Sequence, residues 1–254
     1  MGHPEKRNGP CPNRRRQDNG TGARGDEGQL PLRQVPIRQP RFGIIVAAGQ
    51  GRRFGGLKQF ALVQGKPLIQ FSLRAFELCP DVTGYVLVVN RSKLSEARAL
   101  VKTLRLRKVL ALVAGGSERQ ESVANGLACL PESGFVAIHD GVRPFVTPRM
   151  LSYGFKVCQR HQAAAYGTFV TDTLKLVRNG WLIRTIDRNG VVAIQTPQFF
   201  SLPLLRRAMV SAPKATDECA LVERLGIRPR LLLSPGINLK VTTRADLRLC
   251  ETLL

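Results

Sequence analysis

The sequence has no apolar run that approaches the roughly 18 residues of a membrane-spanning helix, and no signal-peptide core near its start. Its six cysteines are widely spaced, with no C-x-x-C pair and no histidine at metal-ligand spacing. They are therefore expected to be buried or incidental thiols in a reducing compartment. We predict a cytoplasmic protein that does not associate with a membrane.

Acidic residues are scarce, 18 against 39 Lys and Arg, and the formal net charge is +21. Such an excess raises nucleic acid as a partner. The basic residues are scattered through every segment, however, and one Trp and three Tyr offer little surface for base stacking. A basic surface that attracts phosphorylated small molecules explains the charge as well, so specific nucleic-acid binding is not favoured. An arginine-rich RNA-binding module stays open as an alternative, and its affinity would fall steeply with salt.

The composition changes near residue 40. Residues 1–40 are rich in Gly, Pro, Asn, Arg and Gln and lack apolar periodicity, which predicts a disordered basic tail. Residues 41–254 are long enough for one α/β domain with a full core.

Within 41–254, apolar runs typical of buried strands alternate with segments of helical period, which predicts an α/β fold with a mostly parallel sheet flanked by helices. Ser92 and Thr216 are expected to cap helices, as is Thr243 near the end. The expected strands are 44–48, 85–89, 109–113, 135–138, 230–233 and 238–241. The expected helices are 68–78, 92–103, the segment after the GGSERQES motif, 202–209, the segment after residue 216 and the closing segment.

The first predicted strand leads into a glycine-rich, basic loop, GQGRRFGGLKQ. Gly49 and Gly51 let the backbone turn tightly and bring its N–H groups close to a ligand, and Arg53 and Lys58 add positive charge. This arrangement is typical of phosphate binding at the carboxyl end of a strand, although a simple strand-to-helix turn with solvated cations would share it.

Two familiar phosphate loops do not match this segment. The dinucleotide pattern G-x-G-x-x-G requires glycine where Phe54 stands. A Walker A loop that starts at Gly51 requires lysine where Leu57 stands. The sequence therefore indicates a phosphate loop of a third kind.

Two later loops follow predicted strands and should meet the first at the same edge of the sheet. GGSERQES brings the backbone of Gly116 close to a ligand and places Ser122 in the first turn of a helix. HDGVRPF places Asp140 and Arg143 at the end of the next strand. Asp140 is suited to hold Mg²⁺ against substrate phosphates. It could instead cap a turn, with Arg143 as its ion-pair partner.

Polar and apolar residues alternate around Asn179-Gly180, which predicts a β-hairpin arm at about 168–193. The faces of such an arm cannot all reach one core. We therefore expect it to pack on another subunit, in a homodimer.

The charged residues suit nucleotidyl transfer to a phosphate acceptor. There is no Ser-His-Asp set and no cysteine nucleophile, and an anionic acceptor needs no general base. The barrier lies in bringing two anions together and in stabilising charge on the leaving pyrophosphate, for which cations and Mg²⁺ serve. The cations on loops or strand ends are Arg53, Lys58, Arg143, Arg188 and Lys240.

Eight motifs in order resemble the 2-C-methyl-D-erythritol 4-phosphate cytidylyltransferase family: AAGQGRRFGGLKQ, GGSERQES, HDGVRPF, VTDTLK, DRNG, QTPQFF, TDECALVE and NLKVT. The resemblance covers about 42–254. It implies an enzyme that converts CTP and 2-C-methyl-D-erythritol 4-phosphate to 4-diphosphocytidyl-2-C-methyl-D-erythritol and pyrophosphate, with Mg²⁺. It also implies a Rossmann-like fold that dimerises through a β-arm. A ribitol or other polyol 5-phosphate cytidylyltransferase shares HDGVRPF and stays open, because physics alone cannot rank two phosphorylated polyols.

The resemblance also implies roles for individual residues. Arg53 and Lys58 would stabilise the transition state around the triphosphate, Arg188 and Lys240 would position the acceptor, and Asp140 would bind the metal. An exchanged arm would bring Arg188 to the neighbouring subunit's site. The nucleotide-binding positions would be Ala47, Ala48, Gly49, Gly51, Gly116 and Ser122, and the acceptor contacts Arg143, Thr173 and Thr216.

Overall fold

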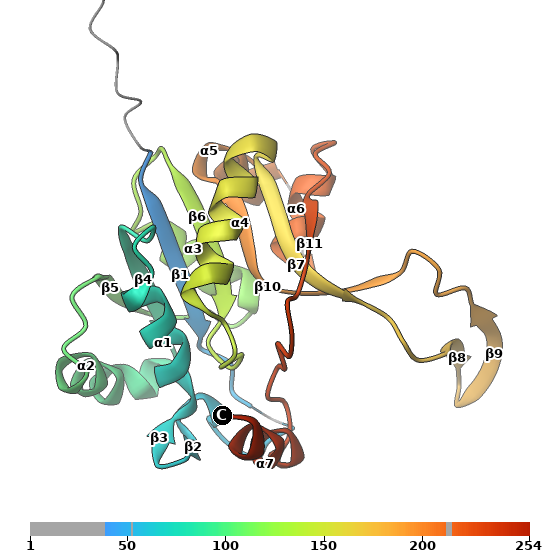
Figure 1. Cartoon of the computed structure of the whole chain (residues 1–254), viewed down its shortest axis with the longest axis horizontal. Helices are drawn as coiled ribbons and strands as arrows, with labels where there is room; N and C mark the ends of the chain where they lie inside the picture. The colour runs from blue at the N-terminus through green and yellow to red at the C-terminus, as the bar shows by residue number, and fades with distance from the viewer. Residues whose placement is uncertain (1–38, 52, 212–214) are drawn as a thin grey trace, which may run out of the picture. The chain divides into compact units, whose positions relative to one another are not determined.

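A seven-stranded mixed sheet with the strand order β11-β7-β10-β6-β1-β4-β5 forms the centre of the computed structural model (Figure 1). The structure describes residues 39–254 except 52 and 212–214. The tail expected at 1–40 thus lies outside the described residues, apart from its last two. The strands of the sheet are β1 Arg41–Ala47, β4 Gly84–Val89, β5 Val109–Ala114, β6 Phe135–Asp140, β7 Ala163–Phe169, β10 Val192–Ser201 and β11 Arg230–Leu233.

The sheet is mostly parallel. Strands β6, β1, β4 and β5 run parallel to one another, with Ile44 opposite Val86 on one side and Ile138 on the other. Strand β10, which contains the QTPQFF motif, is antiparallel to both β6 and β7, whereas β11 is parallel to β7. The predicted fold class is confirmed, with β10 as an antiparallel strand that the sequence analysis did not assign.

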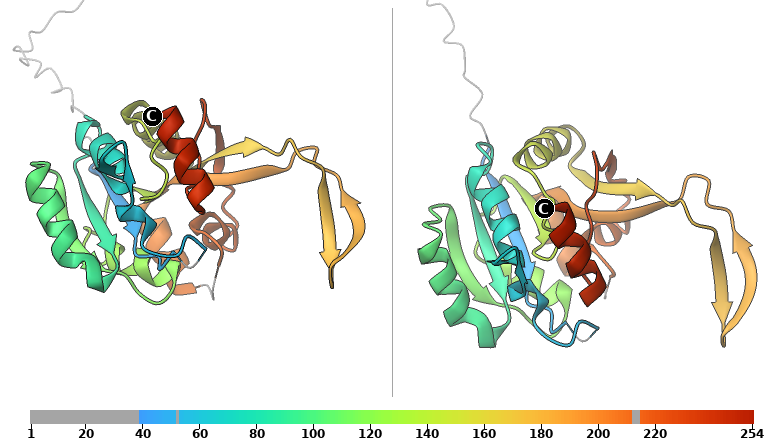
Figure 2. Two further views of the ribbon diagram at one scale, coloured as in Figure 1. Left: turned by 90° about the horizontal axis from the view of Figure 1, so that it is seen from below. Right: turned by 60° about the horizontal axis from the view of Figure 1, so that its bottom comes forward.

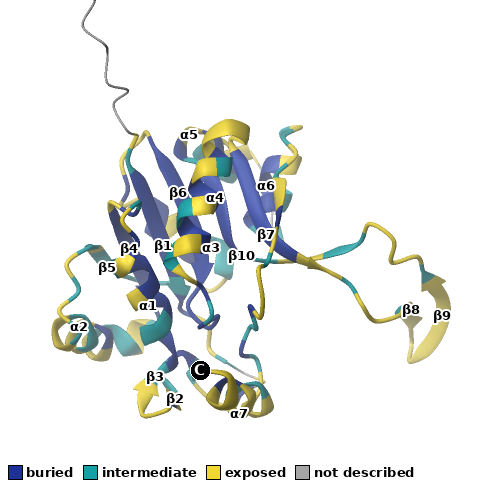
Figure 3. Ribbon diagram, in the orientation of Figure 1, coloured by how far each residue is buried: buried dark blue, intermediate teal, exposed yellow. Residues whose placement is uncertain are grey.

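Helices cover both faces of the sheet (Figures 1 and 2). Alternate residues of β1 enter opposite cores: Ile45 packs in the first and Ile44 in the second, and both are fully buried. Figure 3 shows the central strands, β1 among them, as mostly buried. Burying one such side chain contributes about 1.5–3 kcal/mol. No helix in the described part of the chain is long and apolar enough to cross a membrane. The first core includes α1 Leu68–Leu78, α2 Leu94–Thr103 and α4 Pro148–His161, and the second α3 Arg119–Leu127, α5 Leu202–Ser211 and α6 Glu218–Glu223.

The last helix, α7 Arg244–Leu253, packs beside the glycine-rich loop. Thr243 caps it as predicted, because its side chain accepts a hydrogen bond from the Asp246 N–H at 3.2 Å. A third apolar cluster joins Cys250 of α7 to Phe54 of the loop, and the Arg244 guanidinium lies 5.4 Å from the centre of the Phe54 ring. Near this cluster lie η1 Lys58–Phe60, β2 Leu62–Val63 and β3 Lys66–Pro67.

Two predicted helix caps are wrong. The side chain of Asn90, not Ser92, accepts the first hydrogen bond, from the Ser92 N–H at 3.0 Å, and a short turn, η2 Arg91–Lys93, precedes α2. At α6 the cap is Asp217, whose carboxylate accepts from the Ala220 N–H at 3.0 Å, so Thr216 lies outside the helix. In both cases an amide or carboxylate one or two residues away takes the place of the hydroxyl.

Two further elements differ from expectation. Helix α4 was not assigned from the sequence, although Thr147 accepts from the Met150 N–H at 3.2 Å and Pro148 follows at the first helical position. The segment 238–241, expected as a strand, is irregular. Its Asn238 side chain donates to the Thr196 carbonyl at 2.9 Å, so a side-chain bond fixes the segment instead of a strand ladder.

The predicted hairpin is present as β8 Leu174–Arg178 and β9 Trp181–Ile186, which pair with each other and not with the central sheet. Asn179 and Gly180 form the turn with φ values of 50° and 81°, as an Asn-Gly turn allows. We call residues 168–193 the arm; it extends away from the sheet (Figures 1 and 2). Trp181 on the arm is 76% exposed and Leu182 69%.

Candidate active site

A cavity of about 330 Å³ lies where the carboxyl ends of the parallel strands meet the glycine-rich loop, and we call it the loop cavity. Residues of the segments after β1 and β5 form much of its wall, as expected for an open α/β sheet. Residues predicted for the site that line it are Ala47, Ala48, Gly49, Gly51, Arg53, Lys58, Gly116, Ser122, Asp140 and Lys240. The structure therefore brings together most of the predicted site.

The glycine-rich loop is a tight turn closed on its own backbone. The carbonyl of Gly51 accepts hydrogen bonds from the N–H groups of Phe54 at 2.8 Å and Gly55 at 3.0 Å. Gly51 has a φ of +65°, and a Cβ there would lie 1.9 Å from the Gly56 carbonyl oxygen. Only glycine fits this position without moving the loop.

Gln59, which the sequence analysis did not assign, fastens the loop to the sheet. Its side chain is buried and its Nε2 donates to the carbonyls of Ala47 at 2.5 Å and Gly49 at 3.0 Å. These carbonyls belong to the end of β1 and the start of the loop. The bonds thus fix the backbone where the cavity begins.

The second glycine-containing loop is fastened by Ser122. The Gly116 N–H donates to the Ser122 hydroxyl at 3.1 Å, and that hydroxyl donates to the Glu118 carbonyl at 3.0 Å. A Cβ at Gly116 would lie 2.4 Å from Cβ of Glu121. The loop therefore approaches the start of α3 more closely than any larger residue allows.

Asp140, at the end of β6, is surrounded by three cations. Its Oδ1 lies 3.1 Å from Nε of Arg119, and its Oδ2 lies 2.7 Å from Nζ of Lys240 and 3.8 Å from Nε of Arg143. Burial alone would raise the pKa of this carboxyl, but Arg119, Lys240 and Arg143 outweigh burial and hold the pKa well below its usual range. Asp140 is thus ionised throughout the neutral pH range. Arg143 is indeed an ion-pair partner of Asp140, as the structural alternative proposed.

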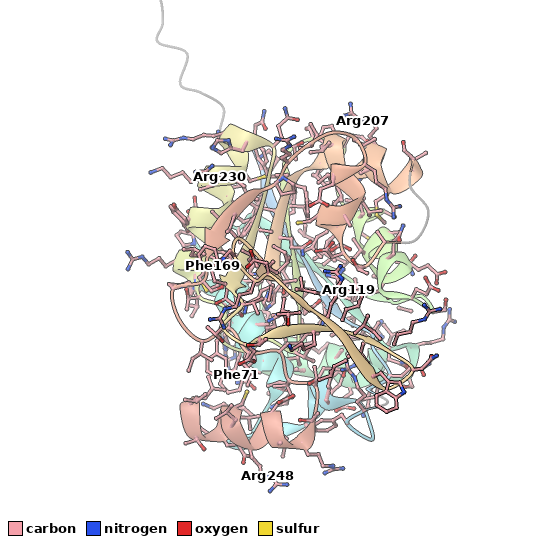
Figure 4. All side chains as sticks on the ribbon, turned by 90° about the vertical axis from the view of Figure 1, so that its right-hand side faces the viewer. Phe71, Arg119, Phe169, Arg207, Arg230 and Arg248 are labelled. Carbon is pink, nitrogen blue, oxygen red and sulfur yellow. The ribbon has the colours of Figure 1, made fainter. Side chains whose placement is uncertain are left out.

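Arg119, labelled in Figure 4, joins Asp140 to Glu218 at the start of α6. Its Nη1 lies 2.7 Å from both carboxylate oxygens of Glu218, a side chain that is 1% exposed. The sequence analysis placed neither Arg119 nor Glu218 in the site. The GGSERQES and TDECALVE motifs contain them, but only the fold shows that these distant segments meet.

A second cavity, of about 300 Å³, lies beside β10, and we call it the β10 cavity. Arg143 and Thr216 line it, together with polar residues of β10. Arg119, Asp140 and Lys240 line both cavities. The two cavities therefore meet at these three charged residues.

His139 is not available as a general base. It is fully buried, and its ring nitrogens lie 3.2 Å from the hydroxyls of Ser72 and Thr196 and 3.1 Å from the Arg143 carbonyl. Burial lowers its pKa to about 4, so the ring is neutral near pH 7. It serves to hold the turn that carries Asp140 and Arg143.

Two predicted site residues lie apart from both cavities. Thr173 and Arg188 are exposed on the arm, where Arg188 Nη1 donates to the Thr171 carbonyl. Neither lines the loop cavity or the β10 cavity. A single chain thus does not bring them to the other site residues.

Within the described residues, no three or more His, Cys, Asp or Glu side chains are grouped to hold a metal ion. Asp140 lines both cavities, and a carboxylate oxygen can take more than one partner. Mg²⁺ commonly binds through one or two carboxylates plus substrate phosphates and water. The donor set therefore fits an Mg²⁺ that arrives with a phosphorylated substrate and does not fit a metal coordinated by protein alone.

A family model described as 2-C-methyl-D-erythritol 4-phosphate cytidylyltransferase matches residues 42–254. A protein of that name from Geobacillus thermodenitrificans is 42% identical over 217 residues, which cover 83% of this chain and 95% of the relative. One from Dehalococcoides mccartyi is 36% identical, with 83% and 94% covered. A crystal structure of 4-diphosphocytidyl-2C-methyl-D-erythritol synthase superposes with a TM-score of 0.75 at 28% identity, with 85% and 99% covered. The Thermus thermophilus cytidylyltransferase gives a TM-score of 0.68 at 29% identity, with 85% and 98% covered.

Proposed function

The chain belongs to the 2-C-methyl-D-erythritol 4-phosphate cytidylyltransferase family, and from this premise we propose its reaction and the roles of its site residues. It is an enzyme that converts CTP and 2-C-methyl-D-erythritol 4-phosphate to 4-diphosphocytidyl-2-C-methyl-D-erythritol and pyrophosphate. An oxygen of the acceptor phosphate forms a bond to the α-phosphorus of CTP, and the bond from that phosphorus to pyrophosphate breaks. The observation that carries the assignment is the meeting of two cavities at Asp140, Lys240 and Arg119.

The loop cavity takes CTP in this proposal. The backbone around Ala47, Ala48 and Gly116, with Ser122, surrounds cytidine, and the N–H groups of Gly49 and Gly51 face the triphosphate. The tight closure of the loop supports this role, because its backbone is fixed before a ligand arrives.

Arg53 and Lys58 stabilise the charge that builds up on the leaving pyrophosphate. In the described part of the chain neither forms an ion pair within 4.0 Å. Burial, with repulsion from Lys240 and Arg53, lowers the pKa of Lys58, although Asp140 and Asp246 oppose the shift. The cavity therefore holds positive charge that an anionic ligand would relieve.

The β10 cavity takes the acceptor. Lys240 and Arg143 attract its phosphate, and Thr216 lies on the same wall. Because Lys240 contacts Asp140 at 2.7 Å, its ammonium must be shared between this carboxylate and the acceptor phosphate. The acceptor phosphate is already an anion, so the attack needs no proton transfer to a base.

Arg188 and Thr173 complete the acceptor site from the arm of a second subunit in a homodimer. Their exposure, and their distance from both cavities along the arm, support a role in another chain's site. The exposed apolar residues of the arm, Trp181 and Leu182 among them, support an interface there.

Asp140 would hold Mg²⁺, which when bound supplies positive charge against the triphosphate. Around it, Arg119 and Glu218 keep the carboxylate in place, and Arg53, Lys58 and Lys240 orient the two anions. A location in the cytoplasm and the absence of a nucleic-acid partner stay predictions.

The test is pyrophosphate release by the purified protein with CTP and Mg²⁺, with 2-C-methyl-D-erythritol 4-phosphate and ribitol 5-phosphate as parallel acceptors. We expect release with the former alone, and none from a Lys58→Ala control prepared in the same way. Release with ribitol 5-phosphate alone would move the enzyme to the polyol alternative. No pyrophosphate release with either acceptor would indicate an inactive homologue.

A further inference from the structure

Two residues that line the β10 cavity each have one buried polar atom without a hydrogen-bond partner in the described structure. The atoms are Oε1 of Gln198 and Nε of Arg143, from side chains whose residues are 2% and 8% exposed. Buried polar atoms in native proteins are nearly always hydrogen-bonded, and an unpaired one costs free energy. Nε of Arg143 has only the 3.8 Å ion pair with Asp140, and Oε1 of Gln198 has no hydrogen-bond partner in the described structure, which indicates a ligand in this cavity that bonds to one or both.

The orientation of the Gln198 amide is fixed by its neighbours. Its Nε2 donates to the Asp217 carboxylate at 2.8 Å and to the Gln195 carbonyl at 3.4 Å. A flipped amide would place an oxygen against these two acceptors. Asp217 is itself held, because its other oxygen accepts from the Ala220 N–H at 3.0 Å. Gln198 therefore presents Oε1 as a preorganised hydrogen-bond acceptor.

The chemistry of this atom selects the part of the ligand it can meet. An amide oxygen needs a hydrogen-bond donor, and an ionised phosphate has none. A hydroxyl group can donate to Gln198 Oε1, whereas Nε of Arg143 can donate to a hydroxyl or to a phosphate oxygen. We propose that Gln198 is a specificity-determining residue that accepts a hydrogen bond from one hydroxyl of the acceptor's polyol chain. The inference rests on the proposed function, because it places the acceptor in the β10 cavity.

Gln195 provides a matched control on the same wall. It is also a glutamine of β10, but its Oε1 already accepts from the Ser234 hydroxyl at 2.7 Å and the Asn238 amide at 2.9 Å. Its role is to hold neighbouring segments together. A substitution there should disturb the cavity without removing a free acceptor.

The experiment compares kcat/KM for 2-C-methyl-D-erythritol 4-phosphate with that for analogues lacking one hydroxyl each, in the wild type, Gln198→Met and Gln195→Met. For the wild type we expect kcat/KM with one analogue to be about 10- to 100-fold lower than with the intact acceptor. For Gln198→Met we expect kcat/KM with the intact acceptor to fall by a similar factor relative to the wild type. With that analogue, Gln198→Met should have the same kcat/KM as the wild type, and CTP affinity should be unchanged. Gln195→Met should keep the wild-type discrimination.

The inference would be overturned if Gln198→Met kept the wild-type ratio of kcat/KM between the intact acceptor and every analogue. Equal losses with all acceptors and with CTP, which a purely structural role would give, would overturn it too. If Gln198→Met does not fold, Gln198→Asn shortens the side chain while keeping an amide, and the same loss of discrimination is expected. No pyrophosphate release by the wild type with the intact acceptor would instead overturn the proposed function, and the inference with it.

Discussion

The loop cavity and the β10 cavity adjoin each other but are built differently. Segments that follow the parallel strands β1 and β5, several of their residues glycines, line much of the loop cavity. Side chains of the antiparallel strand β10 and of residues near α6 form the β10 cavity. A backbone cavity suits a triphosphate, whose oxygens accept from N–H groups, whereas a side-chain cavity can select among acceptors of similar charge.

The two cavities also differ in completeness. The residues proposed to bind CTP all line the loop cavity of one chain. Of those proposed to bind the acceptor, Thr173 and Arg188 lie on the arm instead. If the arm serves a second chain as proposed, nucleotide binding is a property of one chain and acceptor binding is a property of the dimer. Four predictions test the proposed roles of the two cavities and of the arm.

Arg53→Ala should have the largest effect. Because Arg53 acts on charge that appears only as pyrophosphate leaves, we expect kcat to fall by about 10³-fold or more, with little change in CTP affinity. The measurement is steady-state kinetics together with calorimetric titration of CTP. Equal losses in kcat and in affinity would contradict a transition-state role.

Arg188→Ala should raise KM for 2-C-methyl-D-erythritol 4-phosphate by about 10- to 100-fold, because it removes a charged contact to the acceptor, and leave KM for CTP nearly unchanged. Mixing Arg188→Ala with Lys58→Ala should restore activity. A mixed dimer then has one site with an intact cavity and an intact partner arm.

The control for this mixture is Lys58→Ala with Lys240→Ala. Both substitutions lie in the cavity-forming part of the chain, so no mixed dimer has an intact site. No restoration in the first mixture would mean that Arg188 serves its own chain or neither. Restoration in the control would mean that Lys58 and Lys240 do not act in the same chain's site.

Trp181→Ser should weaken the dimer more than the fold. Trp181 is 76% exposed in one chain, so its loss should change the free energy of unfolding of that chain by no more than about 0.5 kcal/mol. At an interface, a buried tryptophan is often worth about 2 kcal/mol, or about 30-fold in the dissociation constant. Analytical ultracentrifugation would measure the dissociation constant of the dimer. The control is Val210→Ser, because Val210 lies on α5 and is 89% exposed. An unchanged dimer would contradict the arm interface.

Lys58→Arg should have the smallest effect near pH 7 and should change the pH dependence at higher pH. Because the pKa of Lys58 is lowered, its charge is lost as the pH rises through a value below that of an ordinary lysine. We expect kcat/KM for CTP to fall over that range and kcat to fall at higher pH, because bound triphosphate favours the charged form. In Lys58→Arg, which stays charged, the fall in kcat/KM should move to higher pH. The same fall in both proteins would exclude Lys58 as its cause.

The sequence predicted the loop cavity well because its signals are local. An apolar strand followed by glycines and cations needs only its own neighbours to be interpreted, and Gly51 confirms why glycine is required. The expected strands at 44–48, 85–89, 109–113 and 135–138 are present for the same reason. Periodicity within one segment determines them.

The β10 cavity was predicted less well because long-range contacts form it. Arg119 and Glu218 are 99 residues apart, and Asn238 reaches Thr196 across 42 residues. Nothing in the local pattern around Gln198 shows that its amide nitrogen is held and its oxygen is free. Capping failed at Ser92 and Thr216 because Asn90 and Asp217, close by, are competing caps of equal or better propensity.

The wall of Arg119, Asp140 and Lys240 that the two cavities share has a thermodynamic consequence. In the proposed binding mode, Lys240 cannot move toward one anion without changing the charge that Asp140 and Arg119 present to the other, so the two substrates would not bind independently. Such coupling is reciprocal: whatever factor CTP applies to the affinity for the acceptor, the acceptor applies to the affinity for CTP. One carboxylate with its two cations would therefore make the affinity for each substrate depend on whether the other is already bound.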